Sequence, residues 1–433
     1  MSVKRAKWAI FLFSVIGLCH AALAVSNDQF AYHGYVRSGV GTNDKGGSQI
    51  CVGNSGAGSN EFRLGNECGI YNEMAFQANH LTNAKNGAFF YSAYRLAMSE
   101  EGYGDWEDSP IALREVYAEG GRFYKTPYTF WAGKRFYRDN DIFMNDWYYY
   151  ADMSGNGAGV GSIPFFKGNL AMAWLRKVVK KDPSGNEVVT NVGHMSLDVF
   201  DFRWTGVKLG EKSYLKMWLA LAKSSSGVDV STNKIYPGLS GGALAGLWEL
   251  QLENGGFHHL ALMYGRGPLN DFYMNFNLYE EGSANQEAAQ KAQRARVVSH
   301  LLHRPSDKWA YFLASLAEFR DSGATSNSQE GWYSVGIRPI YFVNDHFQWT
   351  GQIGTSIVSG QGQEDRIWTR VSLGPQVALG NGVWSRPTIT AFIAYNRWND
   401  ANKTLFNDPS QPQVAYQGET EMWNLGARME VFF

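Results

Sequence analysis

Apolar and polar residues alternate along four stretches of the chain, with the period of two that is typical of a β-strand. The clearest stretch is residues 424–433, and the same period is found in residues 32–40, 333–341 and 389–398. The apolar positions of the last two stretches end in a tyrosine, as expected where a strand crosses a membrane interface. The pattern predicts strands with one face toward lipid and the other toward water.

Alternation also occurs in soluble β-sandwiches, so composition has to distinguish a membrane β-barrel from a soluble β-sandwich. Aromatic residues make up 15% of the chain, which has 48 glycines and a mean hydropathy of only −0.31. A transmembrane β-barrel combines these properties because it has aromatic girdles outside and a polar lumen inside. No segment after the N-terminal region has 18 consecutive apolar residues, which excludes a bundle of membrane-spanning helices. The predicted fold class is all-β, a transmembrane antiparallel barrel.

Turn-forming residues at 181–186, 224–228, 240–242 and 360–362 separate the expected strands. Residues 283–297 favour a helix instead, and we expect this segment in or beside an external loop. The pattern does not fix strand boundaries residue by residue in the middle third of the chain.

The N-terminus has the three parts of a secretory signal peptide: basic residues, an apolar run at 8–18 and small residues at 22–24. The alternative is an uncleaved anchor, but the run is shorter than the ~20 residues that a membrane-spanning helix needs. We expect a signal peptide at 1–24 and one barrel domain at 25–433, because no linker composition divides the remainder.

Charge and cysteine usage narrow the function classes. With 39 basic and 40 acidic residues, the chain has no global field that would attract nucleic acid. Once a signal peptide is removed, only Cys51 and Cys68 remain, and two cysteines in an exported chain most often form a disulfide. Catalytic or metal-binding thiols are the alternative, without a CxxC or Cys-His spacing to support them. The nine histidines form no HExxH motif, so we expect no metal site.

Residues 130–159 have the most unusual composition in the chain. Thirty positions hold three basic residues, four carboxylates and nine aromatics. An apolar core could not pair so many charges, and a surface loop gains nothing from so many rings. The wall of a water-filled sugar site uses both, since rings stack on pyranose faces while charged and hydroxyl groups bind sugar hydroxyls. We therefore interpret this stretch as the centre of a carbohydrate site.

Several blocks, in order over nearly the whole chain, resemble maltoporins, the trimeric sugar-selective porins of the Gram-negative outer membrane. They are residues 32–41 (YHGYVRSGVG), 62–68 (FRLGNEC), 131–137 (WAGKRFY), 336–341 (GIRPIY), 384–387 (WSRP) and the end of the chain. The resemblance implies an 18-stranded antiparallel barrel whose third loop, here the stretch 130–159, folds inward and constricts the pore. It also implies a homotrimer that lies among outer-membrane lipid and lipopolysaccharide and carries maltodextrin oligosaccharides.

The resemblance further implies roles for individual residues. The aromatic slide on which the sugar would stack comprises Tyr35, Tyr71, Trp106, Phe257, Trp398 and Phe432, with Trp106 reaching in from a neighbouring subunit. The polar track comprises Arg37, Arg63, Glu73, Arg114, Asp146 and Tyr148, and the constriction loop contributes Arg135, Arg138, Asp139 and Asp141. The strand pattern separately puts Tyr35, Trp398 and Phe432 on the polar, lumenal parity. The alternatives are packing or girdle aromatics and bracing ion pairs.

Asp139 stands where the family has an arginine, so a porin for another saccharide, such as sucrose or a β-glucoside, is one alternative. The expected function is facilitated diffusion through several shallow sites, without a cofactor or energy source. A second alternative is an exported glycoside hydrolase that uses Asp139 with Asp146, or Glu107 with Asp108, although sequence does not set the distance between carboxylates. A purely structural or adhesive barrel is a third.

Overall fold

The computed structural model describes residues 25–26, 29–54, 56–57, 61–82, 87–100, 110–181, 185–191, 193–274, 277–402, 416 and 418–433. The expected signal peptide and Trp106 lie outside these ranges. Among the described residues, no helix is both long enough and apolar enough to cross a membrane.

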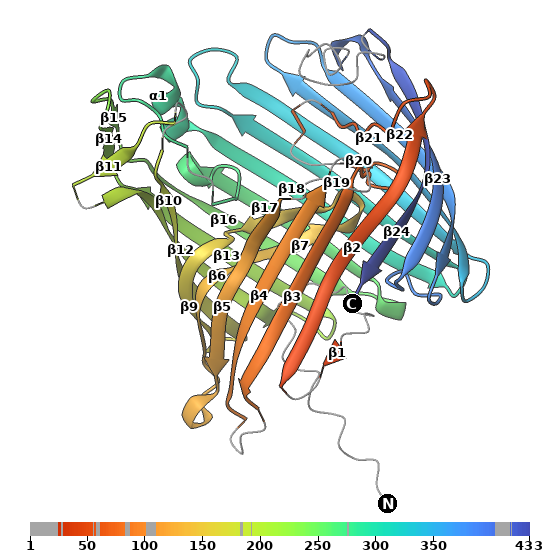
Figure 1. Cartoon of the computed structure of the whole chain (residues 1–433), viewed down its shortest axis with the longest axis horizontal. Coiled ribbons are helices and arrows are strands. Elements are labelled where there is room, and N and C mark those ends of the chain that lie inside the picture. Colours follow the sequence, from red (N-terminus) through yellow and green to blue (C-terminus); the bar gives the residue numbers. More distant parts are fainter. Residues whose placement is uncertain are drawn as a thin grey trace, which may run out of the picture.

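Eighteen long strands form one closed antiparallel barrel, as predicted (Figure 1). They are β2 (Phe30–Asn43), β3 (Ile70–Leu81), β4 (Phe89–Glu100), β5 (Ile111–Gly121), β6 (Thr129–Arg135), β9 (Gly155–Phe165), β10 (Gly168–Val179), β12 (Gly193–Lys208), β13 (Ser213–Ser224), β16 (Ser240–Gln251), β17 (Phe257–Arg266), β18 (Gln293–Ser306), β19 (Trp309–Asp321), β20 (Gln329–Phe342), β21 (Phe347–Gly360), β22 (Arg366–Ala378), β23 (Thr388–Trp398) and β24 (Glu421–Phe432).

The remaining elements are short. Four of them extend the sheet: β1 (Val25–Ser26), β11 (Val188–Thr190), β14 (Gly227–Asp229) and β15 (Ile235–Tyr236). A separate hairpin consists of β7 (Arg138–Ile142) and β8 (Trp147–Asp152). The helices are α1 (Ala284–Lys291) and the 3₁₀ turns η1 (Phe123–Lys125), η2 (Phe143–Asn145), η3 (Glu253–Gly255) and η4 (Gly267–Leu269).

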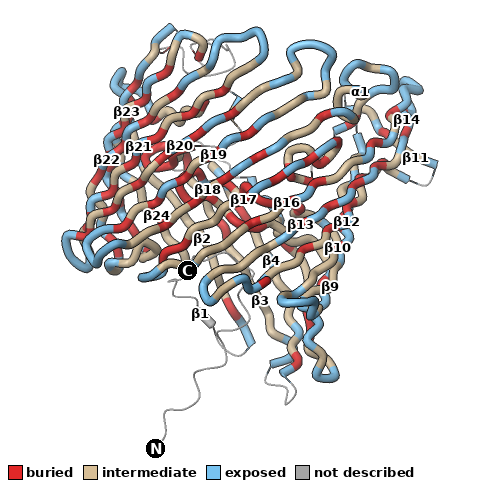
Figure 2. The backbone as a smooth tube through the Cα atoms, turned by 180° about the vertical axis from the view of Figure 1, so that it is seen from behind, coloured by how far each residue is buried: buried red, intermediate tan, exposed pale blue. Residues whose placement is uncertain are grey.

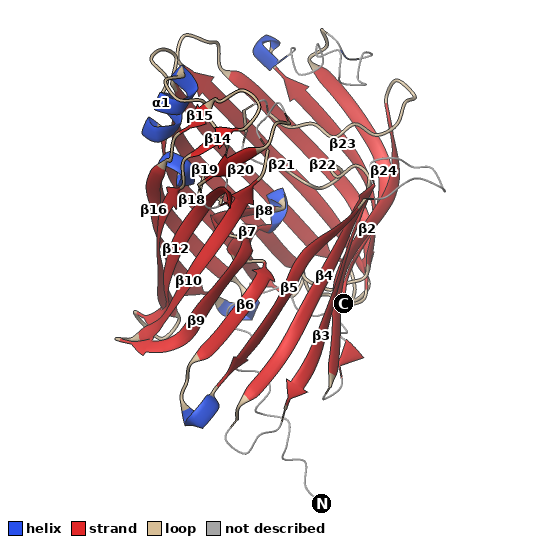
Figure 3. Cartoon of the chain, turned by 60° about the vertical axis from the view of Figure 1, so that its left-hand side comes forward, coloured by secondary structure: helices blue, strands red, loops and turns tan. Residues whose placement is uncertain are grey.

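The first and last long strands close the barrel. β2 pairs antiparallel with β24, in a register that runs from Tyr35 opposite Phe432 to Asn43 opposite Asn424. The Gly34 N–H donates to the Phe433 carbonyl at 2.7 Å, so the pairing extends to the last residue. Figure 3 shows this wall from a second side. Closure leaves no unpaired edge, and 18 strands are enough to surround an aqueous channel, which eight strands are not.

The two ends of the barrel differ in their connections. At the end where β2 begins and β24 ends, here called the terminal end, connections are as short as residues 166–167 and 307–308. At the opposite end, here called the loop end, they include the long segments 44–69 and 267–292. This asymmetry is typical of outer-membrane barrels, which have short turns on one side of the membrane and long loops on the other.

Less exposed and more exposed residues alternate along many of the strands, as the sequence pattern predicts (Figure 2). One outward row crosses three neighbouring strands and consists of Leu373, Ile393 and Leu425, each about half exposed. The inward positions of the same wall include fully buried polar side chains such as Arg370 and Asn396. All four predicted strands are confirmed in β2, β20, β23 and β24, except that Phe433 lies one residue beyond the end of β24. Apolar residues therefore face outward and polar residues inward, the reverse of a soluble protein.

Two local predictions need correction. Residues 240–242 are not a turn but the start of β16, where a side chain on Gly241 would collide with the carbonyl oxygen of Arg266. The helix predicted at 283–297 is confirmed only for Ala284–Lys291, with the Ser283 hydroxyl accepting from the Gln286 N–H at 3.2 Å. From Gln293 onward the chain pairs with β17, because strand pairing outweighs local helix propensity there.

Candidate functional site

The stretch 130–159 divides between the barrel wall and one connection. Its first six residues belong to β6 and its last five to β9, so the connection is residues 136–154, with β7, η2 and β8. This connection contacts inward-facing residues of distant strands. Arg296 of β18 donates to the Tyr149 carbonyl at 2.7 Å, and the Phe143 ring lies 5.5 Å from the ring of Phe312 on β19. The connection therefore contacts β18 and β19, which are not neighbours of its own strands β6 and β9.

A second connection, residues 44–69, supports the first. The Phe62 N–H donates to Asn145 Oδ1 at 3.2 Å and the Arg63 N–H donates to the Met144 carbonyl at 2.8 Å. The Phe62 ring is fully buried and stacks on Trp368 of β22 at 5.5 Å. The connection is crosslinked by the Cys51–Cys68 disulfide that the sequence predicted. Residues 61–64 therefore form a wedge between the η2 turn and the barrel wall.

Three of the predicted slide aromatics lie together across the closing strands. The Tyr35 ring is 5.1 Å from Phe432 and 6.0 Å from Tyr71, measured between ring centroids. We call these three rings the first aromatic group. All three side chains are only partly buried, so ring surface remains accessible.

A second aromatic group begins at the η2 turn. Phe143, Trp384 and Phe312 contact one another at centroid distances of 5.1–5.5 Å. His300 continues the group from Phe312, at 6.2 Å, to Phe257, at 5.1 Å. We call these five rings the second aromatic group. Among them only Trp384 is more than slightly exposed.

Arg386 joins the two groups, with its guanidinium 5.0 Å from the Phe432 ring and 5.6 Å from the Phe143 ring. Trp384 and Arg386 belong to the WSRP block of the family resemblance, which implies no role for either. The block itself was the available signal, because it directly precedes β23 and adjoins a predicted lumenal strand face.

Trp398 does face inward, as its parity predicts, but the structure covers it. Its side chain is 3% exposed and its indole N–H donates to the Glu419 carbonyl at 2.8 Å. It lies apart from both aromatic groups, opposite Trp368 in the β22–β23 register. Phe257 belongs to the second group but is 7% exposed.

The predicted polar residues surround the first aromatic group. Arg37 forms ion pairs with Glu67 and with Asp146, the latter at 3.0 Å, and its guanidinium lies 5.2 Å from the Tyr71 ring. Arg63 donates to the Tyr35 hydroxyl at 2.6 Å. The Tyr35 hydroxyl in turn donates to Glu430 at 3.0 Å.

Further along the same wall, Glu73 accepts from the Tyr71 hydroxyl and pairs with Arg95 at 3.1 Å. Arg114 and Arg138 lie over the Phe136 ring at 4.9 and 4.0 Å, and Arg138 also lies over Tyr148 at 3.9 Å. Every predicted polar-track residue therefore belongs to one ring-and-ion network.

The predicted constriction residues occupy different settings. Arg135 ends β6, where it pairs with Glu119 at 3.1 Å and lies over the Trp131 ring. Asp139, the departure from the family pattern, is 8% exposed, and its Oδ2 lies 3.5 Å from Lys216 Nζ. This lysine of the wall also pairs with Glu249, at 2.9 Å, so the two carboxylates share it. Burial, with a further contribution from Asp146, raises the pKa of Asp141 to about 6.

No group of three or more His, Cys, Asp or Glu side chains in the described part of the chain is placed to hold a metal ion. The model of the LamB porin family matches residues 30–433. The chain belongs to the LamB porin family. Membership makes this LamB-family porin an outer-membrane protein and points to a transport channel rather than an enzyme.

Several solved structures match this chain over most of its length at low sequence identity. DcaP of Acinetobacter baumannii is 8% identical, covering 94% of this chain and 98% of that chain with a TM-score of 0.47. OpdQ of Pseudomonas aeruginosa is 8% identical, covering 94% and 99% with a TM-score of 0.48. A BenF-like porin from Pseudomonas fluorescens is 9% identical, covering 93% and 99% with a TM-score of 0.47. At these identities and scores, the family assignment rests on the family model.

Proposed function

We propose that this LamB-family porin conducts maltose and maltodextrins across the outer membrane by facilitated diffusion. The observation that carries the proposal is the run of rings from Tyr71 through Phe432 to Trp384, joined by Arg386 and flanked by ion-paired side chains. Oligosaccharides have apolar C–H faces and hydroxyl edges, so rings beside charged hydrogen-bonding groups suit both parts of the molecule.

The rings would act as neighbouring platforms on which successive pyranoses stack. Each stacking contact contributes on the order of 0.5–1.5 kcal/mol, so two or three contacts give dissociation constants of roughly millimolar or weaker. Such shallow sites suit a channel, because a deep site would retain the sugar. Arg37, Arg63, Glu73 and Asp146 would exchange hydrogen bonds with sugar hydroxyls while their ion pairs hold them in place.

Trp384 is our candidate for the platform that the sequence comparison assigned to Trp398. The Trp398 ring is covered and its N–H is already bonded to Glu419, which leaves no face for a sugar. Trp384 is more exposed and contacts Phe143 of the η2 turn.

The connection 136–154 is our candidate for the constriction. Support comes from its bonds to Arg296 and Arg203, which belong to strands far apart around the wall. The Arg203 guanidinium donates to the Tyr137 carbonyl at 2.9 Å, near the start of the connection. We also propose a homotrimer, in which each protomer has its own pore.

Planar-bilayer conductance of the purified protein, titrated with maltohexaose, tests this function. Triplet conductance steps that the sugar blocks saturably would support pore, trimer and selectivity together. Conductance that maltohexaose leaves unchanged would refute the maltodextrin assignment. In the same assay, block by sucrose or a β-glucoside alone would reassign the substrate, and cleavage of maltoheptaose by the pure protein would favour a hydrolase.

A further inference from the structure

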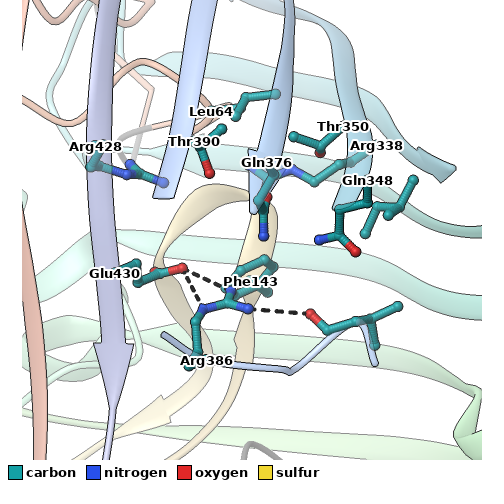
Figure 4. A pocket seen from close by; sticks show the side chains of 12 residues that line it. Leu64, Phe143, Arg338, Gln348, Thr350, Gln376, Arg386, Thr390, Arg428 and Glu430 are labelled. Carbon is teal, nitrogen blue, oxygen red and sulfur yellow. Dashed lines mark hydrogen bonds and ion pairs between the residues drawn. The ribbon is translucent and has the colours of Figure 1, made fainter. Parts of the chain in front are cut away.

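A polar cavity lies in the wall between the η2 turn and strands β20–β24 (Figure 4). Its volume is about 20 Å³, whereas ~10–15 Å³ is enough for one water molecule. The side chains that matter here are Arg338, Arg428, Thr350, Thr390, Gln348 and Gln376. In Figure 4 the Arg338 and Arg428 side chains reach into the cavity from opposite sides, with Gln376 and Thr390 between them. The cavity therefore accepts a single small occupant among hydrogen-bond donors.

The charges around this cavity do not cancel. Three arginines and one carboxylate, Glu430, line it. Both oxygens of Glu430 are already engaged, Oε1 by Arg63 at 2.8 Å and Oε2 by Arg386 at 2.7 Å. Arg428 is paired with Glu67. Each available carboxylate is thus used by a cation other than Arg338.

Arg338 is the cation without a counter-ion. Its side chain is 5% exposed, and no carboxylate among the described residues forms an ion pair with it. Its Nε and Nη2 donate to Gln352 Oε1, the former at 3.1 Å, and this amide oxygen also accepts from the Leu64 N–H at 3.1 Å. No protein acceptor for Nη1 occurs within the described ranges. A buried charge bonded only to one shared amide oxygen is poorly compensated.

The Phe143 ring compensates this cluster only in part. The guanidiniums of Arg63, Arg338 and Arg386 lie 4.9, 5.1 and 5.6 Å from its centroid. A ring attracts a cation by roughly 0.5–2 kcal/mol but carries no charge of its own. Three cations around one ring therefore still repel each other, and a negative ion in the adjacent cavity would lower that repulsion.

We propose that this cavity binds one small inorganic anion, of the size of chloride. Arg338 and Arg428 supply the positive charge, and the Thr350 and Thr390 hydroxyls with the Gln348 and Gln376 amides supply neutral donors. Guanidinium and hydroxyl groups are ordinary anion ligands, and charge-assisted hydrogen bonds are stronger than neutral ones. The volume excludes organic anions such as gluconate. The site does not depend on which sugar the channel carries.

The test uses crystals of the purified protein grown without halide and soaked in sodium bromide at physiological ionic strength. Bromide scatters anomalously, and we expect a peak beside the Arg338 guanidinium. Absence of that peak in an otherwise well-ordered map overturns the proposal. A peak that forms only in molar bromide also overturns it, because it would mark an adventitious ion.

Variants and stability provide a second readout. Arg338→Gln should lose the bromide peak, whereas Arg397→Gln, which removes an exposed arginine from the outer face of β23, should keep it. If Arg338→Gln fails to fold, the wild-type protein still decides the question. Its thermal unfolding midpoint should rise with chloride relative to gluconate at equal ionic strength, by the linkage of ligand binding to stability. Equal midpoints together with an empty cavity refute the site, and so does an unchanged peak in Arg338→Gln.

Discussion

The wedge at residues 61–64 depends on two glycines that face each other across β20 and β21. Gly336 and Gly354 are register partners, and the Phe62 ring lies against both. A methyl group on Gly354 would lie 2.6 Å from Phe62 Cδ1, with two further ring carbons closer still. The ring cannot retreat, because Trp368 is stacked on it and is itself fully buried.

Gly354→Ala should therefore expel the ring rather than shift it slightly. Losing a buried phenylalanine side chain costs about 3–5 kcal/mol. At about 1.4 kcal/mol per tenfold, 3 kcal/mol increases the open population of the wedge more than ~100-fold. The backbone bonds from Phe62 and Arg63 to the η2 turn should open with it, whereas the barrel strands should keep their pairing.

Hydrogen–deuterium exchange of the peptide 61–68 measures this opening directly. Its protection should fall by about two orders of magnitude in Gly354→Ala. Gly246→Ala is the matched control, since no atom lies within 4 Å of the added methyl group. In a Phe62→Ala background, Gly354→Ala should have no further effect, because the clash is gone. Wild-type protection in the single Gly354→Ala variant would refute the reasoning.

Four shorter predictions concern the same connections. Trp384→Ala should weaken maltohexaose block about 2- to 10-fold in the conductance titration, and an unchanged block would remove it from the sugar path. Replacing Cys51 and Cys68 by serine should speed exchange of the crosslinked segment, because the disulfide contributes about 3 kcal/mol; equal exchange would contradict this. Burial raises the pKa of Glu61 to about 7, so the folded wedge favours the neutral carboxyl group. The free energy that holds the wedge closed is therefore greatest below pH 4.5, and it falls as the pH rises from there through 7. In Glu61→Gln, the protection factors of the wedge should no longer depend on pH. A pH dependence that remains in this variant would exclude Glu61 as its cause. Asp141 becomes charged as the pH rises through about 6, so the preference of the channel for cations should increase over this range. Reversal potentials measure this preference, which should not change with pH in Asp141→Asn. An equal increase in that variant would assign the effect to another group.

The orientation of side chains toward the two faces could be predicted from sequence because the strand period is local. Ile393 and Asn396 face opposite sides of β23 simply because their separation is odd. The common lumenal parity of Tyr35 and Phe432 was predicted in the same way, although parity does not give the contact between their rings.

Whether another part of the chain covers a lumen-facing side chain could not be predicted in this way. Trp398 and Trp384 both lie near β23, but the backbone around Glu419 covers one and leaves the other more exposed. Likewise, the sequence indicates a charge reversal in a pore at Asp139, but it does not show that Lys216, 77 positions later, lies 3.5 Å from this carboxylate. Parity indicates a direction, whereas occlusion depends on contacts between residues far apart in sequence.

Pairing of β2 with β24 both closes the barrel and assembles part of the first aromatic group. Gly34 exchanges two backbone hydrogen bonds with Phe433, so closure of the barrel requires that residues about 400 positions apart in the sequence meet. Before these residues meet, β2 and β24 each have an unpaired edge, which is a template for pairing with another chain. Tyr35 and Phe432 become neighbours only through this pairing, so a variant in which β24 does not pair with β2 would also separate two of the three rings of the first aromatic group.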